Sequence, residues 1–134
     1  NWFPSANRHK LDKYGEIKRA LDQWLDSAKS MVLNKKRYGD RVCIISFEDL
    51  IRRTEAVMRY LADFLEIRFD NILLMPTFNK IPIKPNTSFK LEKPGIMFSA
   101  LERYKTLSRE ELNIIEKLTG DAYTQALSTV ASIP

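Results

Sequence analysis

Apolar residues recur at helical spacing over the first third of the chain. They fall three or four positions apart, with charged residues between them: Ile17, Leu21, Trp24, Leu25, Ala28, Met31 and Val32. This pattern predicts an amphipathic helix of about five turns. We expect Gly39 to be its left-handed cap, after the basic Lys35-Lys36-Arg37. The basic triplet can contact a phosphate, but a helix C-terminus attracts cations without any ligand, and we favour that structural role.

A continuous apolar run comes next. Val42 to Ile45 is rich in β-branched residues and lies between Gly39-Asp40 and Ser46, which predicts a short buried strand at 41–46. A strand covered on both faces belongs to an α/β sheet with parallel neighbours, and the sequence offers no second one. We therefore expect residues 1–134 to be a single partial domain of a larger α/β fold, mostly helical within this chain.

Two short helices are predicted after the strand. Ser46 is a helix cap for Phe47 to Leu50, with Asp49 three residues on. Thr54 is expected to cap a longer helix whose apolar stripe consists of Val57, Met58, Leu61, Phe64 and Leu65. Glu48 and Asp49 are adjacent, so on a helix they point about 100° apart and cannot flank one bond. We favour a structural role for both carboxylates.

The segment from Thr77 to Gly95 has no periodicity. It is rich in Pro, Asn, Ser and Lys, and it follows one further helical turn expected at Asp70 to Leu74. We expect an irregular, lid-like loop at 77–95, because a loop of this length without a function is uncommon. Its apolar residues are expected to anchor it to the core: Phe78, Ile81, Ile83 and Phe89.

The last third of the chain again has helical spacing. A helical segment is predicted from Ile96 to Tyr104. Ser108 and Glu111 have the spacing of a capping box for a second helix, which Gly120 is expected to end. A last short helix is predicted from Asp121.

The net charge of +5, from 22 basic and 17 acidic residues, favours an anionic partner. Cys43 is the sole cysteine and lies in the predicted strand, so an inert, buried thiol is expected. No apolar run is long enough to span a membrane, and the first residues lack a signal-peptide pattern. We expect a soluble protein, cytoplasmic in preference to secreted.

Motifs for common chemistry are absent from the sequence. There is no Gly-rich phosphate loop, no set of His and Cys with metal-ligand spacing, and no nucleophile elbow. The aromatic residues fall on helix faces and in the loop, and do not alternate with basic residues as in a nucleic-acid-binding sheet. We expect no metal, no nucleic-acid partner and no membrane partner.

The order of the short motifs carries more information than any one of them. In order and spacing they resemble the C-terminal portion of sulfotransferases that use 3′-phosphoadenosine 5′-phosphosulfate (PAPS), over roughly Leu21 to Leu127. The matching pieces are Tyr38-Gly39-Asp40-Arg41-Val42, Ser46-Phe47-Glu48-Asp49-Leu50, Glu55-Ala56-Val57, Leu61-Ala62-Asp63-Phe64-Leu65, Phe69-Asp70, Pro76-Thr77-Phe78-Asn79, Pro82-Ile83, Pro85-Asn86-Thr87-Ser88-Phe89 and Gly95-Ile96.

This resemblance implies a P-loop-like α/β fold and transfer of a sulfuryl group from PAPS to a hydroxyl or an amine. The family's phosphosulfate-binding loop and its main catalytic residues are expected upstream of this chain, so no catalytic residue is assigned here. We therefore expect the chain alone to be inactive, because half of the cationic clamp around the migrating group is missing. The acceptor class is not indicated.

The resemblance also implies which residues bind the cofactor. Lys90, Lys93 and Gly95 occupy the place of the basic loop that closes over the 3′-phosphate. Lys93-Pro94 resembles the protein-tyrosine sulfotransferases, and the closing helix resembles bacterial members. A lysine ammonium and the backbone N–H of a nearby glycine can both donate to the same phosphate. The candidate cofactor-binding residues are Lys93, Gly95, Lys90, Asn79 and Ser88; a solvated Lys93 and turn-forming polar residues are the alternative interpretation.

A second functional class stays open at this point. The chain can also be a small, basic, helical interaction module that binds phosphorylated or nucleic-acid partners through Lys35 to Arg37 and the loop. In either case we expect a homo-oligomer, because an uncovered strand edge or apolar face favours association.

Overall fold

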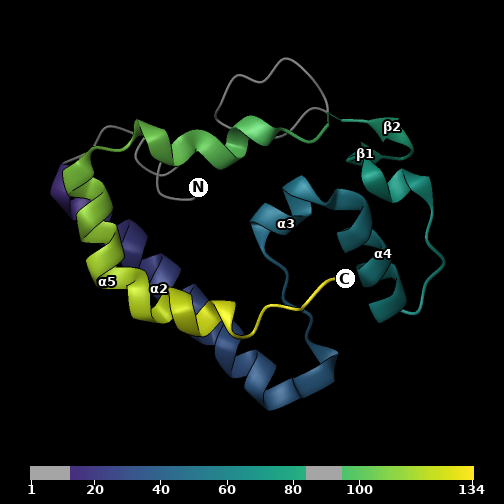
Figure 1. The fold of residues 1–134 in the computed structure, drawn as a ribbon, viewed down its shortest axis with the longest axis horizontal. Coiled ribbons are helices and arrows are strands. Elements are labelled where there is room, and N and C mark those ends of the chain that lie inside the picture. Colours follow the sequence, from purple (N-terminus) through teal and green to yellow (C-terminus); the bar gives the residue numbers. More distant parts are fainter. Residues whose placement is uncertain (1–12, 84–94) are drawn as a thin grey trace. The chain divides into compact units, whose positions relative to one another are not determined.

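The computed structural model describes residues 13–83 and 95–134. These divide into two compact units. The first contains residues 13–44 and Ser99–Val130; the second contains 45–83, 95–98 and Ala131–Pro134. The described chain is mostly helical, as the sequence predicts (Figure 1).

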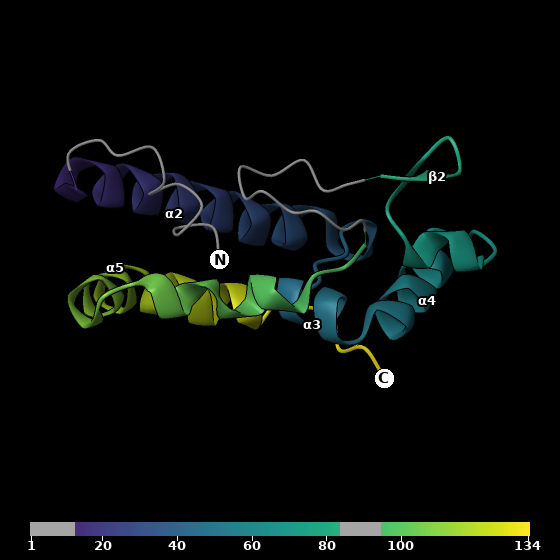
Figure 2. The ribbon, with the colours of Figure 1, turned by 90° about the horizontal axis from the view of Figure 1, so that it is seen from above.

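Two long helices form the first unit. Helix α2 is Lys13–Tyr38 and helix α5 is Arg109–Leu127, and they lie against each other in both views (Figures 1 and 2). Ile17, Ala20 and Leu21 are buried at one end of α2, packed against Leu107, Ile114 and Ile115. Leu107 leads into α5, so the starts of the two helices meet and the helices run in the same direction.

The end of α2 confirms the predicted cap. Gly39 has φ +54, a left-handed conformation that favours glycine, and it begins the 3-10 helix η2, Gly39–Arg41. The Lys35 ammonium donates to the Gly39 carbonyl at 3.1 Å and to the Val42 carbonyl at 2.8 Å. Lys35 therefore has the structural role predicted for it, since it satisfies carbonyl groups just beyond the helix end.

The predicted strand at 41–46 is wrong. Arg41 belongs to η2, and residues 42–46 form no regular element. Val42 has the backbone angles of a strand, and Ile44 is buried. A strand, however, also needs a neighbour for its N–H and C=O groups, and the described residues place none beside it. The apolar run thus predicted burial only in part, since Ile44 is buried and Val42, Cys43 and Ile45 are half-buried, and it predicted secondary structure wrongly.

Helices α3 (Phe47–Arg52) and α4 (Thr54–Phe64) start the second unit. The Ser46 hydroxyl accepts from the Asp49 N–H at 3.0 Å, which confirms that cap, and donates to the Asp49 carboxylate at 2.9 Å. The predicted Thr54 cap is wrong by one residue, because Arg53 precedes α4. The Thr54 hydroxyl donates back to the Leu50 carbonyl at 2.7 Å, across the short break between the two helices.

The core of the second unit is centred on α3 and α4. Val57 and Ala62 on α4 have almost no exposed surface, and Ile51 on α3 is also buried. The Arg53 guanidinium donates to the Ile133 carbonyl at 2.8 Å, which attaches the end of the described chain to this unit. The 3-10 helix η3, Asn71–Leu74, follows and confirms the helical turn expected at Asp70 to Leu74; Asp70 itself is its N-cap.

The C-terminal helices differ from the prediction at two points. The 3-10 helix η4, Phe98–Thr106, replaces the helical segment expected at Ile96 to Tyr104. The Ser108–Glu111 capping box is confirmed. Gly120 does not end α5, which continues to Leu127 in place of two short helices. A glycine inside a helix costs about 1 kcal/mol relative to alanine, and α5 nevertheless continues, with Thr119 before the glycine and Ala126 after it both buried.

Candidate functional site

The candidate cofactor-binding residues lie on and around the 77–95 segment. Asn79 and Gly95 are described by the structure, and both belong to the second unit. Lys93, Lys90 and Ser88 lie outside the described residues. The structure therefore gives the conformation of the two ends of the candidate loop.

The start of this segment is a β-hairpin, where an irregular loop was expected. Strand β1 (Thr77–Phe78) pairs antiparallel with β2 (Ile81–Pro82), in the register Thr77 with Pro82 and Phe78 with Ile81. The Ile83 N–H donates to the Pro76 carbonyl at 3.1 Å and extends the pairing by one bond. The hairpin holds Asn79 at its tip.

Asn79 and Lys80 form the two-residue turn, with φ +50 and +67. Positive φ at both positions is the geometry of the type I′ turn that joins tight hairpins. Asparagine tolerates this conformation, whereas lysine is unusual there, and the missing Asn-Gly signal explains why periodicity did not reveal the hairpin. Asn79 thus has a turn-forming role in the structure. Lys80, which the sequence analysis did not single out, adds an exposed ammonium at the same tip.

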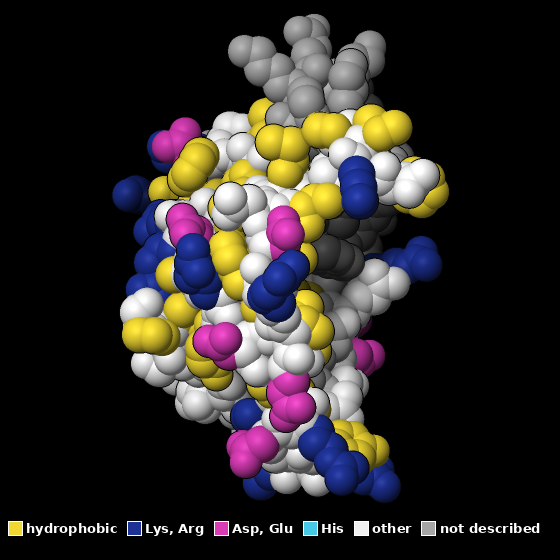
Figure 3. All heavy atoms as spheres, turned by 90° about the vertical axis from the view of Figure 1, so that its right-hand side faces the viewer, with side chains coloured by type: hydrophobic (Ala, Val, Ile, Leu, Met, Phe, Trp, Pro, Cys, Tyr) yellow, Lys and Arg dark blue, Asp and Glu magenta, His cyan; other side chains and the backbone are white. Residues whose placement is uncertain are grey.

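The expected anchoring by apolar loop residues is wrong for the part that the structure describes. Phe78 is 76% exposed, Ile81 is 67% exposed and Ile83 is 43% exposed. The two strands are only two residues long, too short to form a buried face of their own. In Figure 3, hydrophobic side chains are exposed at the top of the view, where Figure 1 places the hairpin. Phe89 lies outside the described residues.

Gly95 marks the other end of the loop. Its φ is +107, a backbone conformation that side-chain-bearing residues rarely adopt. A Cβ placed there would meet no atom within 4 Å. The backbone conformation therefore requires glycine here, and crowding by neighbouring atoms does not. The open space around Gly95 also allows a ligand to approach its backbone closely.

The segment that leads into the hairpin is held by a stacked arginine. The Arg59 guanidinium lies 4.0 Å from the centroid of the Phe69 ring and donates two hydrogen bonds to the Glu55 carboxylate, at 2.8 and 3.0 Å. Glu66, with φ +55, turns the chain after α4. The chain from α4 to η3 is thus tied to α4 by a cation–π contact.

The composition of the loop suits an anion. Between Thr77 and Gly95 the sequence has four lysines and one glutamate: Lys80, Lys84, Lys90, Lys93 and Glu92. Lysine ammonium groups and backbone N–H groups are donors only, so together they recognise phosphate and sulfate oxygens. Within the described ranges no cluster of His, Cys, Asp and Glu can hold a metal ion.

Other candidate groups have structural roles. Asp49 forms an ion pair with Arg53 at 3.3 Å and accepts from Ser46, as favoured for it above. Cys43 is half-buried, and desolvation raises the pKa of its thiol, while the nearby Lys35 opposes that shift in part. A raised pKa disfavours the thiolate, so Cys43 has no sign of an activated nucleophile. Of the basic triplet, Lys35 is engaged with two carbonyl groups and Arg37 lies over the Tyr38 ring, whereas Lys36 is exposed.

No helix among the described residues is long and apolar enough to cross a membrane. No curated protein and no solved structure matches the chain. The family model described as "Sulfotransferase domain" matches residues 8–113, which is most of the chain and includes the hairpin, the lysine-rich loop and Gly95. This chain therefore belongs to the sulfotransferase family.

Proposed function

We propose that this protein transfers a sulfuryl group from PAPS to a hydroxyl or amine acceptor, and that the chain is part of a P-loop-like α/β fold. The observation that carries the proposal is the sulfotransferase domain match over residues 8–113. In this proposal the chain forms the side of the donor site that closes over the 3′-phosphate. In this proposal the residues that act on the migrating group lie in polypeptide beyond this chain.

The described ends of the loop support this assignment. Gly95 has an open backbone at φ +107, next in sequence to the lysine-bearing stretch. The hairpin turn presents Asn79 and the Lys80 ammonium from the other end. Lys93 and Lys90 supply the positive charge, and the Gly95 N–H, Asn79 and Ser88 supply neutral donors. A charge-assisted hydrogen bond of this kind contributes about 1.5–3 kcal/mol.

The reaction defines what these groups do. The bond between sulfur and the 5′-phosphate oxygen breaks, a new bond forms between sulfur and the acceptor oxygen or nitrogen, and the acceptor's proton leaves to a base. Adenosine 3′,5′-bisphosphate is the leaving group. Donors fixed on its 3′-phosphate position the donor molecule for in-line transfer, because phosphoryl-like transfer depends on positioning and electrostatic stabilisation.

Calorimetric titration and a transfer assay test the proposal. The full-length gene product that contains this chain should bind adenosine 3′,5′-bisphosphate more tightly than adenosine 5′-monophosphate, by roughly tenfold or more, because only the former has the 3′-phosphate. It should also transfer radiolabelled sulfuryl groups from PAPS to some member of an acceptor panel of sugars, phenols, alcohols and amines. The 134-residue chain alone should show no transfer. Equal affinity for the two nucleotides together with no labelled product would contradict the proposal.

A further inference from the structure

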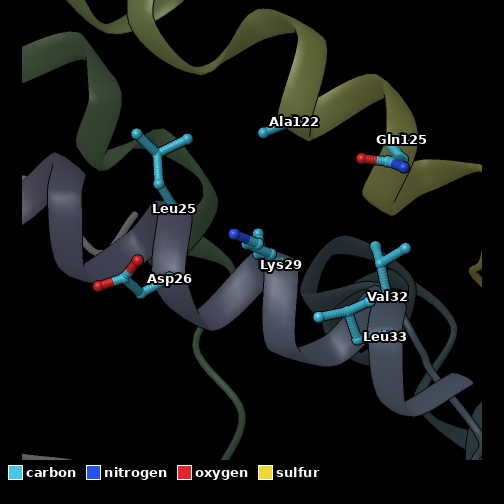
Figure 4. A pocket seen from close by; sticks show the side chains of 8 residues that line it. Leu25, Asp26, Lys29, Val32, Leu33, Ala122 and Gln125 are labelled. Carbon is cyan, nitrogen blue, oxygen red and sulfur yellow. The ribbon is translucent and has the colours of Figure 1, made fainter. Parts of the chain in front are cut away.

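A pocket lies between α2 and α5, within the first unit. Its volume is about 380 Å³, at the small end of the range for ligand sites. The floor is apolar and comes from both helices: Leu25, Ala28, Val32, Leu33 and Ala122. Its polar groups are Asp26, Lys29 and Gln125, which line the edge (Figure 4).

Two of these polar side chains point toward the space between the helices. In Figure 4 the Lys29 ammonium and the Gln125 amide face the gap from opposite sides, whereas the Asp26 carboxylate points away from Ala122. Among the described residues neither Lys29 nor the Gln125 amide has a hydrogen-bond or ion-pair partner. Lys18, on the same helix, is instead paired with Asp22 at 2.7 Å. Lys29 is thus a cation available at the edge of an apolar hollow.

We propose that this pocket binds a single-chain amphiphile with one anionic head group, a carboxylate or a sulfate ester. The chain lies on the Leu25, Val32 and Leu33 side chains, where burial of each CH₂ group contributes about 0.8 kcal/mol. The head group accepts from the Lys29 ammonium and from the Gln125 amide N–H groups. The pocket belongs to the first unit, whereas the proposed donor loop belongs to the second.

The charges at the edge select the head group. An ammonium is a donor only, so it binds an anion most strongly, binds the oxygen of an alcohol more weakly, and repels a quaternary amine. The Asp26 carboxylate lines the same edge and disfavours a second negative charge, which restricts the ligand to a monoanion. The chain's net charge of +5 adds a weak attraction in the same direction.

Four ligands with the same eight-carbon chain test the head group: octanoate, octyl sulfate, octanol and octyltrimethylammonium, each below its micelle concentration. Trp24 reports binding by its fluorescence, since it adjoins Leu25 in sequence and its ring centroid is 6.4 Å from that of Tyr123 on α5. In the full-length gene product the two anions should bind saturably, and octanol roughly tenfold more weakly. Stronger binding of octanoate indicates a fatty acid, and stronger binding of octyl sulfate indicates a sulfate ester. Either preference supports the site.

Two substitutions and one control locate the binding. Lys29→Met keeps the aliphatic stem and should reduce octanoate affinity to that of octanol. Ala122→Trp fills the hollow and should abolish binding of both. Lys36→Met removes an exposed cation from the same helix, outside the pocket, and should change nothing. Helical circular dichroism checks that each variant is folded.

Three results would overturn the proposal. One is equal binding of octanoate and octyltrimethylammonium to the wild type. Another is unchanged octanoate affinity in a folded Lys29→Met variant. The third is a dimer in sedimentation that Ala122→Trp converts to a monomer, which would show that a second copy of the chain occupies the pocket. The result of the nucleotide titration has no bearing on these outcomes, because no nucleotide is used.

Discussion

The two units bury their apolar residues to different extents. In the first unit, α2 and α5 enclose Ile17, Ala20 and Leu21 between them. In the second unit, α4 buries Val57 completely, yet the adjoining hairpin leaves Phe78 and Ile81 largely exposed. Two amphipathic helices can cover each other's apolar stripes, whereas a hairpin with two-residue strands is too small to bury its own side chains. Apolar side chains of this chain are thus buried where two of its described elements pack on each other, as α2 and α5 do, and exposed in the short hairpin.

The largest effect is expected from truncation in the helical core. Leu21 is 4% exposed and is packed in the cluster with Ile17 and Ala20, so Leu21→Ala should lower the free energy of unfolding by about 2–5 kcal/mol. Leu118→Ala is the matched control, since Leu118 is on the partner helix and 51% exposed. Urea unfolding followed by circular dichroism measures both. Similar losses in the two variants would show that the α2–α5 core is not formed.

A second effect compares one helix cap from each unit. Ser108→Ala removes the capping box of α5, and Ser46→Ala removes the cap of α3. Each should reduce stability by about 1 kcal/mol, because one backbone N–H at the helix start loses its acceptor. Ser132→Ala is the control, on an exposed serine outside any helix. A Ser46 variant as stable as the control would mean that α3 depends on packing and not on its cap.

Helix positions could be predicted from the sequence because their signals are local. The Ser108–Glu111 spacing, the glycine at position 39 and the apolar stripe of α4 each involve residues within a turn or two of one another. Each therefore specifies an element without reference to the rest of the fold. The misplaced Thr54 cap and the continuation of α5 past Gly120 are errors at helix ends, where side-chain packing and backbone propensity compete.

The strand and the hairpin could not be predicted in the same way. Val42 to Ile45 has a strand's composition, but pairing depends on a neighbour distant in sequence. The 77–82 hairpin depends on a turn with a lysine at positive φ, which no common turn signal indicates. Of the candidate site, the sequence identified the family and the lysine-rich loop, while the turn conformation of Asn79 and the exposed Lys80 became evident only from the structure.

A smaller effect is expected at the exposed hairpin. Phe78 is 76% exposed, so Phe78→Ala should change the unfolding free energy by no more than about 0.5 kcal/mol, in contrast to Leu21→Ala. The substitution should reduce self-association more clearly, because less exposed apolar area is then available for contact between copies. Sedimentation at several concentrations measures this. A loss above about 2 kcal/mol would show that Phe78 is buried against another part of the protein.

The smallest effect concerns pH. Burial raises the pKa of the Cys43 thiol, so the folded chain favours the protonated form. The thiol of the unfolded chain ionises at lower pH than that of the folded chain. The protonated thiol therefore contributes to folded-state stability fully at pH values below the ordinary pKa, and this contribution is lost as the pH rises through the folded pKa. The stability difference between the wild type and Cys43→Ser should therefore shrink at alkaline pH. Alkylation by iodoacetamide should also reach its half-maximal rate at a higher pH than for a free cysteine; a lower midpoint would mean that the nearby Lys35 dominates.

The most direct test of the proposed donor site is the contribution of Lys93. In the full-length gene product, Lys93→Ala should weaken binding of adenosine 3′,5′-bisphosphate by roughly ten- to a hundredfold in calorimetry, the equivalent of one charge-assisted contact of about 1.5–3 kcal/mol. Lys93→Arg should restore only part of the affinity, because a planar guanidinium replaces a compact ammonium beside Pro94. Lys117→Ala, which removes an exposed cation from α5, is the matched control and should leave the affinity unchanged. Equal affinities of the wild type and Lys93→Ala would contradict the assignment and leave Lys93 a solvated residue of the loop.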